Sequence, residues 1–247
     1  MEPAPFLRLA DRRRASRSDA RDVAACAPAG FTLVEMVVVL AIIGILTTIT
    51  LLGQSTFNQS LLLTDTAYTM AFSAREAQSF GLSSRQFGGI QNAGAGYGLH
   101  FDRSLPGSYI LFADISHFLT PVSSTICPPN VPGTPEQRPG NCRYDASGPA
   151  DGTVETFTFS RGFTILRFCG KTSGSSKECS DDSSLPLTSL DIVFTRPNTS
   201  ATISGMRASS LDLFSCAEVT VTDQTKTASK IIRLSQLGEI SVGQTCP

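Results

Sequence analysis

The chain has 247 residues, of which 41% are hydrophobic and 17% are charged, and its formal net charge is -1. This length and apolar content suit one folded domain with an attached segment, and they exclude a wholly disordered protein. The near-neutral charge excludes a globally basic nucleic-acid-binding protein, although it is compatible with a local basic patch.

Two segments of opposite character begin the chain. Residues 1–30 are polar and contain six arginines and four acidic residues. The next 22 residues, from Phe31 to Leu52, are apolar, with Glu35 as the only ionisable side chain. A helix of this length spans about 33 Å, which is enough to cross the hydrocarbon core of a bilayer. Because the arginines precede this segment and the next basic residue is Arg75, the N-terminus is predicted to be cytoplasmic and the rest exported.

Three kinds of export signal place a basic segment before an apolar one. A secretory signal peptide needs a small-residue cleavage site behind the apolar run, and residues 45–55 contain no convincing site. A lipoprotein signal needs apolar residues before its cysteine, but a polar stretch precedes Cys26. The third kind is cut before the apolar run, between Gly30 and Phe31, so that the hydrophobic helix becomes the new N-terminus.

The segment GFTLVEMVVVLAIIGIL, residues 30–46, resembles the processing and methylation signature of type IV prepilins and type II secretion pseudopilins. In that signature a glycine precedes Phe-Thr-Leu, a glutamate and an apolar helix. The resemblance implies that a membrane aspartic peptidase cleaves after Gly30 and N-methylates Phe31, so that leader residues 1–30 are lost. The leader is longer and richer in arginine than many leaders of this family.

Glu35 has two interpretations. An acid in the first turn of a helix is favoured by the helix dipole, so Glu35 is explained as a cap of its own helix. The resemblance implies instead that Glu35 meets the amine of Phe31 in a neighbouring subunit, where the exclusion of water makes an unpaired charge costly and fixes the register of assembly. The residue alone leaves both interpretations open, and the complete motif favours assembly.

Apolar residues continue at helical spacing to about Phe80, with Gly81 as the expected C-cap. We therefore expect one long helix, in which residues 31–52 form the membrane-spanning half and residues 53–80 an amphipathic half that packs on a globular domain. The apolar stripe of the amphipathic half comprises Phe57, Leu61, Ala67, Tyr68, Ala71, Phe72 and Ala74.

Residues 81–247 have the shorter periodicity of strands and are predicted to form an exported β-rich domain. The expected fold class is α+β, with the long helix packed on an antiparallel sheet. Residues 191–204 and 219–242 resemble the final hairpins of minor pilins and of the H-class secretion pseudopilin. The expected strands are residues 97–101, 108–114, 154–160, 163–169, 190–196, 216–223, 229–235 and 239–242.

Seven cysteines constrain the compartment. Loss of the leader removes Cys26, and the remaining six can then pair fully in an oxidising environment. No two of them have the short spacing of a zinc site, so no metal is expected. Neighbour pairing is the simplest of the 15 possible connectivities. It joins Cys127 to Cys142, Cys169 to Cys179, and Cys216 to Cys246.

The chain contains no recognisable catalytic or cofactor-binding motif, so we expect neither an enzyme nor a cofactor. His100 and His117 are predicted to be packed or surface residues. Residues 145–152 are rich in aspartate and glycine, and a turn is favoured there over a calcium loop. The basic residues Lys226, Lys230 and Arg233 either contact DNA or form a solvated hairpin face, and the second explanation is favoured.

Together these features predict a structural subunit, minor or priming, of a type IV pilus or a type II secretion pseudopilus. Its expected partners are other pilin or pseudopilin subunits, the prepilin peptidase and methyltransferase, and the bacterial inner membrane, which the helix crosses once. An alternative is a pilus-tip module that binds DNA or adheres to a surface. An anchored enzyme would require a cleft with perturbed acidic groups.

Overall fold

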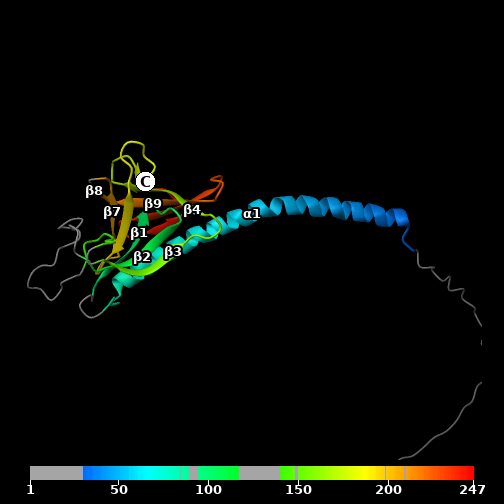
Figure 1. Ribbon diagram of the computed structural model, residues 1–247. Helices are drawn as coiled ribbons and strands as arrows, with labels where there is room; N and C mark the ends of the chain where they lie inside the picture. Colours follow the sequence, from blue (N-terminus) through cyan, green and yellow to red (C-terminus); the bar gives the residue numbers. More distant parts are fainter. Residues whose placement is uncertain are drawn as a thin grey trace, which may run out of the picture. The chain divides into compact units, whose positions relative to one another are not determined.

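The structure, a computed structural model, describes residues 30–83, 85–88, 94–116, 140–147, 150–197, 199–208 and 210–247. The chain divides into two compact units, Met1–Leu51 and Leu52–Pro247. The described residues form one helix and eleven strands (Figure 1). The α+β fold class predicted from the sequence is therefore confirmed.

Helix α1 extends from Leu33 to Leu82, within two residues of its predicted limits. The prediction that Gly81 is the C-cap is wrong, because Gly81 lies inside the helix. A side chain at this position would collide with the backbone carbonyl of Phe194, so glycine allows the helix to approach the sheet closely.

Six antiparallel strands form sheet A, in the order β3-β2-β1-β6-β7-β8. The predicted strands agree with β1, β2, β3 and β6 in existence, whereas β8 was not predicted. The strands are β1 (Gly96–Asp102), β2 (Ser108–Asp114), β3 (Gly152–Thr158), β6 (Ser189–Phe194), β7 (Ala201–Met206) and β8 (Leu211–Phe214).

Sheet B contains five antiparallel strands in the order β11-β10-β9-β4-β5. Ser215 alone separates the last strand of sheet A from β9, so the chain passes directly from one sheet to the other. Every residue of β9 is buried, as expected for a central strand covered on both faces. The strands are β4 (Thr164–Lys171), β5 (Glu178–Cys179), β9 (Cys216–Thr222), β10 (Ser229–Ser235) and β11 (Ile240–Val242).

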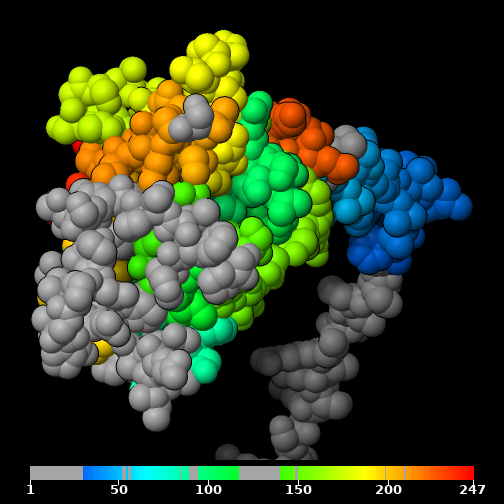
Figure 2. All heavy atoms as spheres, turned by 60° about the vertical axis from the view of Figure 1, so that its left-hand side comes forward, coloured from blue at the N-terminus to red at the C-terminus, as the bar shows by residue number. Residues whose placement is uncertain are grey.

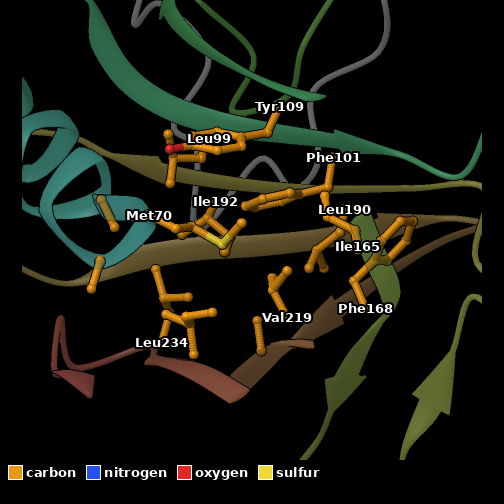
Figure 3. Close-up of a cluster of buried hydrophobic side chains, with 14 of the residues drawn as sticks. Met70, Leu99, Phe101, Tyr109, Ile165, Phe168, Leu190, Ile192, Val219 and Leu234 are labelled. Carbon is orange, nitrogen blue, oxygen red and sulfur yellow. The ribbon is translucent and has the colours of Figure 1, made fainter. Parts of the chain in front are cut away.

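The main core lies between the two sheets and the second half of α1. Figure 3 shows Met70 of α1, Phe101 of β1, Ile192 of β6, and Val219 and Leu234 of sheet B directed into this core. All five side chains are almost completely removed from solvent. Burial of apolar surface from three layers is the main stabilising contribution to this unit.

The predicted apolar stripe of α1 does not form a single packed face. Its alanines, together with Leu63 and Met70, are buried, whereas its four large residues are exposed. The large residues occupy one arc of the helix and the alanines occupy another, so both groups fit a helical period although they lie on different faces. The exposed residues are Phe57, Leu61, Tyr68 and Phe72.

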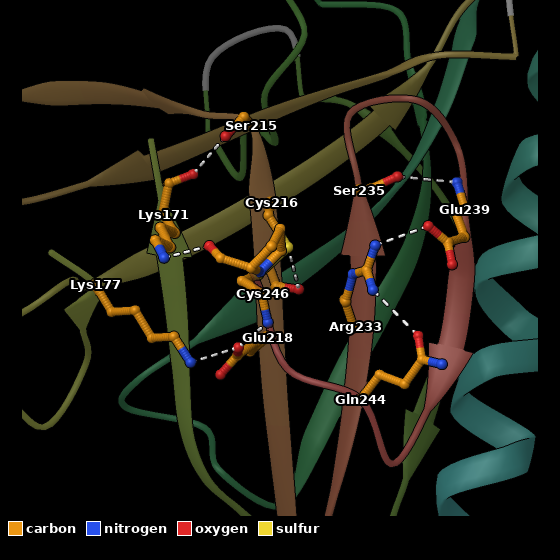
Figure 4. The surroundings of a disulfide bond; sticks show 12 residues. Lys171, Lys177, Ser215, Cys216, Glu218, Arg233, Ser235, Glu239, Gln244 and Cys246 are labelled. Carbon is orange, nitrogen blue, oxygen red and sulfur yellow. Dashed lines mark hydrogen bonds and ion pairs between the residues drawn. A yellow bond between two sulfur atoms is a disulfide. The ribbon is translucent and has the colours of Figure 1, made fainter. Parts of the chain in front are cut away.

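Two disulfides lie within the described residues. Cys169–Cys179 joins β4 to β5, which form a short hairpin. Cys216–Cys246 ties the end of the described chain to β9 (Figure 4). Both are pairs of the simplest connectivity. Cys142 is also disulfide-bonded; Cys127 and Cys26 lie outside the described residues.

The Cys216–Cys246 bond is surrounded by polar contacts. The buried carboxylate of Glu218 accepts hydrogen bonds from the amide of Cys246 and from Nζ of Lys177, the latter at 2.6 Å. Nζ of Lys171 donates to the carbonyl of Pro247. These contacts and the disulfide fix residues 246 and 247 against sheet B, as Figure 4 shows.

Candidate functional site

The start of α1 is capped by Thr32. Its Oγ1 accepts a hydrogen bond of 3.2 Å from the amide of Glu35, and its carbonyl accepts one from the amide of Met36. A threonine followed three residues later by glutamate is the sequence pattern of a capping box. This function of Thr32 was not predicted from the sequence, although the pattern is present there.

Glu35 lies in the first turn of the helix and its side chain is exposed. Its amide is used by Thr32, but its carboxylate has no hydrogen bond or ion pair with any described residue. Gly30 and Phe31 immediately precede the helix and are also exposed. The three residues of the predicted processing and assembly site therefore lie within one short, accessible segment.

The apolar segment Leu33–Leu51 is long and apolar enough to cross a membrane, and none of it is buried within the chain. Its exposed residues include large side chains such as Leu33, Leu40 and Leu51. An apolar surface of this size requires lipid or protein to cover it. The segment is therefore the main candidate surface for insertion and association.

Threonine residues near the end of the apolar segment satisfy their hydroxyl groups within the helix. Oγ1 of Thr47 donates to the carbonyl of Ile43 at 2.8 Å, and Oγ1 of Thr48 donates to the carbonyl of Gly44 at 2.7 Å. Thr50 likewise bonds to the carbonyl of Thr47. Because no hydroxyl hydrogen is left unpaired, these polar residues are compatible with a lipid environment.

A family profile described as a prokaryotic N-terminal methylation motif matches residues 27–51. The match supports the resemblance of the N-terminal segment to type IV prepilins and pseudopilins. The match includes the Gly30–Phe31 junction, Glu35 and the apolar segment. A search of curated proteins finds no match. A search of solved structures finds none either.

The motif implies processing by a prepilin peptidase and assembly with other pilins. Proteins with this motif are structural subunits. Together with the apolar helix, the motif fits a subunit anchored in the inner membrane.

A second exposed surface lies on the part of α1 that belongs to the globular unit. Phe72 is 65% exposed and Phe57 is 64% exposed, which is unusual for aromatic side chains of a folded domain. Tyr68, Phe72 and Arg75 also line a hollow of about 220 Å³ beside β11. We call Phe57, Leu61, Tyr68 and Phe72 the outward stripe.

Buried carboxylates organise residues 140–147, which pack against sheet A through Cys142 and Tyr144. Asp114 accepts hydrogen bonds from the amides of Asn141 and Cys142. Asp151 accepts from the amides of Ile115, Ser116 and Asp145. Burial raises the pKa of Asp151 to about 6 and raises that of Asp114 well above its usual range.

Asp145 and Asp151 lie in the predicted turn at residues 145–152. Their oxygens bond to backbone amides, except that Oδ2 of Asp145 accepts from the side chain of Asn141 and Oδ1 of Asp145 has no partner. Among the described residues, only Cys179, Asp181 and Asp182 bring three metal-ligand atoms together. Since the sulfur of Cys179 is in a disulfide, it is not available as a thiolate ligand.

His100 is packed rather than exposed. Its Nδ1 lies 2.6 Å from Oδ1 of the buried Asp191 on the neighbouring strand, and its ring lies 4.4 Å from that of Tyr144. His100 and Asp191 are far apart in the sequence, so spacing did not predict their contact. His117 lies outside the described residues.

Proposed function

We propose that the chain is a structural subunit, minor or priming, of a type IV pilus or a type II secretion pseudopilus. Residues 1–30 form a leader that is removed by cleavage after Gly30, and Phe31 becomes the methylated N-terminus. Residues 31–52 first anchor the subunit in the inner membrane, with residues 53–80 completing the helix and residues 81–247 exported. The same helix then joins the subunit to its neighbours.

The apolar segment Leu33–Leu51, behind the methylation motif, is the observation that carries this proposal. None of its residues is buried by the described part of the chain. Lipid covers such a surface in the membrane. When the subunit leaves the membrane, apolar helices of other subunits replace the lipid, because exposure of this surface to water is costly.

Glu35 supplies the polar contact of this assembly. Cleavage creates a positive amine on Phe31, and the Glu35 carboxylate is without a partner among the described residues. Between packed apolar helices an unpaired charge is costly, so pairing of Glu35 with the amine of an adjacent subunit favours one register. The capping interaction of the Glu35 amide with Thr32 leaves the carboxylate available for this contact.

The outward stripe extends the assembly surface into the globular unit. Phe57, Leu61, Tyr68 and Phe72 lie on the face of α1 that is turned away from its own core. We expect neighbouring subunits to cover these residues in the filament. Like the apolar segment, these residues are then exposed in the single chain because neighbouring subunits are absent.

The structure favours no DNA-binding function. Arg233 is paired with Glu239 at 2.7 Å and with Gln244 at 3.1 Å, so it is already engaged within its own hairpin. Lys230 lies on the same strand and is only half-exposed. The three basic residues considered in the sequence therefore do not form one free cationic surface.

The processing step is tested by mass spectrometry of the protein extracted from membranes of cells with an active prepilin peptidase. The expected product begins with N-methylated Phe31 and lacks residues 1–30. A product that retains these residues in such cells would contradict the proposal.

The assembly step is tested with Glu35→Ala and with Glu76→Ala as the matched control, because Glu76 is an exposed acid of the same helix. We expect Glu35→Ala to be cleaved and inserted normally. Its incorporation into filaments should fall by at least about tenfold, since a buried charge without its partner costs several kcal/mol. Incorporation of Glu76→Ala should be unchanged.

Normal incorporation of Glu35→Ala would show that Glu35 acts only as part of the helix cap. The variant Thr32→Ala further distinguishes helix capping from pairing with a neighbouring subunit. Loss of this cap weakens the first turn by about 1 kcal/mol, so incorporation should fall much less than in Glu35→Ala.

A further inference from the structure

Two turns at one end of the globular unit present basic side chains in a costly backbone conformation. Arg161 in the β3–β4 turn has φ 58°, and Lys226 in the β9–β10 turn has φ 56°. Glycine or asparagine normally occupies such left-handed positions, because other side chains are strained there. Both side chains are exposed. Strain at two basic residues in adjacent turns points to a function for their charge.

The two turns belong to one continuous surface. Arg161 and residues Gln224 and Thr225 of the β9–β10 turn line a hollow of about 280 Å³. The next residue, Lys226, lines a larger hollow of about 470 Å³ together with Arg103 and Arg167. Figure 2 shows the orange-red β9–β10 turn beside the green region that contains the β1–β2 turn. We call Arg103, Arg161, Arg167 and Lys226 the basic end.

Three acidic residues, Asp102, Asp181 and Asp223, offset the charge of the four basic residues only in part. Asp181 lies 3.5 Å from Arg167, while Asp102 accepts hydrogen bonds from the amide and hydroxyl of Ser104. Asp223 is occupied by its own turn, where hydrogen bonds from Thr225, Ala228 and Thr227 lower its pKa to about 2.

The other three members of the basic end, Arg103, Arg161 and Lys226, have no ion-pair partner among the described residues. The surface therefore retains a net positive charge.

Exposed leucines accompany these basic residues. Leu105 in the β1–β2 turn is 54% exposed, and Leu166 at the irregularity in β4 is 42% exposed. Leu166 lines the larger hollow directly. Basic side chains beside exposed apolar ones are typical of surfaces that bind the interfacial region of an anionic membrane.

The hollow beside the two turns is also lined by Gln59 and Leu62 of α1. Gln59 is the eighth residue after Leu51, where the apolar segment ends. In the sequence, therefore, only seven residues separate the apolar segment from a residue that lines this hollow.

We propose that the basic end binds the headgroups of anionic phospholipids. The proposal rests on insertion of Leu33–Leu51 into the membrane. Arginine side chains donate paired hydrogen bonds to phosphate oxygens, lysine adds a point charge, and the exposed leucines contact the edge of the acyl region. The contact holds the exported domain at the bilayer surface before assembly, and extraction of the subunit into a filament breaks it.

The test uses the full chain in nanodiscs of phosphatidylcholine alone or of phosphatidylcholine mixed with phosphatidylglycerol. Hydrogen exchange is measured at the amides of Phe163, Lys226 and Ala228, which are hydrogen-bonded within the two turns. In anionic discs at low salt, we expect exchange at these amides to slow by about fivefold or more. High salt should abolish the difference, because it screens charges at the surface.

Variants separate the lipid contact from a general effect on folding. Arg161→Gln combined with Lys226→Gln should remove the lipid dependence, whereas Arg161→Lys with Lys226→Arg should retain it. Arg75→Gln is the matched control, since Arg75 is an exposed basic residue of α1 outside the basic end. Its exchange pattern should equal that of the unmodified chain in both kinds of disc.

Equal exchange in neutral and anionic discs would overturn the proposal. It would also be overturned if inorganic phosphate or DNA protected the turns in neutral discs while phosphatidylglycerol did not. Release of the chain from both kinds of disc at alkaline pH would contradict the membrane insertion on which the proposed function also depends. Stable insertion without lipid-dependent protection would refute only the present inference.

Discussion

The two halves of α1 use apolar residues in opposite ways. In Leu33–Leu51 none of the residues is buried, and large aliphatic side chains lie on every face. In the half that belongs to the globular unit, small residues such as Ala67 and Ala74 are completely buried, whereas Phe72 is 65% exposed. Side-chain size therefore separates the contacts made within the chain from those available to partners. Alanines allow the sheets to pack closely, and the large residues remain on the outside.

The largest difference in unfolding free energy is expected between variants on the buried and the exposed face of the second half of α1. Met70→Ala should lower the free energy of unfolding by about 2–5 kcal/mol, because it leaves a cavity in the core. Phe72→Ala should change it by no more than about 0.5 kcal/mol, because most of the Phe72 surface is already exposed. Urea unfolding of the two variants in the same detergent measures both values. Similar losses would show that the outward stripe also stabilises the single chain.

The globular unit also contains buried carboxylates with raised pKa values, so its stability is expected to depend on pH. For Asp151 the folded pKa of about 6 exceeds the ordinary value of 3.8, so the folded chain binds the proton more tightly. Its contribution to stability is therefore complete below about pH 4 and is lost as the pH rises through about 6. Asp114 acts in the same direction.

Asp151→Asn removes this titration. We expect the decrease in unfolding free energy between pH 4 and pH 7 to become smaller by about 2–3 kcal/mol, at about 1.4 kcal/mol per pKa unit. Denaturant titrations at a series of pH values measure the effect. The exposed Asp65→Asn serves as the control and should leave the pH dependence unchanged. If the unfolding free energy of Asp151→Asn depended on pH as in the unmodified chain, other groups would be responsible for the pH dependence.

A smaller difference in stability is expected between alanine substitutions of one glycine in each half of α1. Gly81→Ala introduces a side chain against the backbone of Phe194 and should cost about 1–3 kcal/mol, despite the better helix propensity of alanine. Gly44→Ala meets no atom within 4 Å. It should therefore leave the unfolding midpoint of the globular unit unchanged. Circular dichroism during thermal unfolding distinguishes these outcomes, and equal midpoints would contradict the close packing at Gly81.

The elements predicted best were those with strong local patterns. The helix and most strands have clear periodicity, and the methylation motif is a continuous segment. The strands β5 and β8 have only two and four residues, which is too short for a reliable period. The capping function of Thr32 was also local, and the spacing to Glu35 was sufficient to predict it.

The remaining features depend on contacts between distant segments. Phe72 and Ala74 are both apolar and both fit a helical period, so only the position of the sheets shows which one is buried. The pairing of His100 with Asp191 arises from the register of β1 and β6. Likewise, the basic end combines turns that lie more than fifty residues apart in the sequence.

In the proposed topology, the disulfide between Cys216 and Cys246 also sets an order of events during export. The second cysteine follows the first by 30 residues and comes after all eleven described strands. The bond can therefore close only when the complete sheet-forming region has reached the oxidising side of the membrane. A chain interrupted before residue 246 would keep a free thiol at Cys216, and quality-control factors that recognise thiols would be able to distinguish it from a finished subunit.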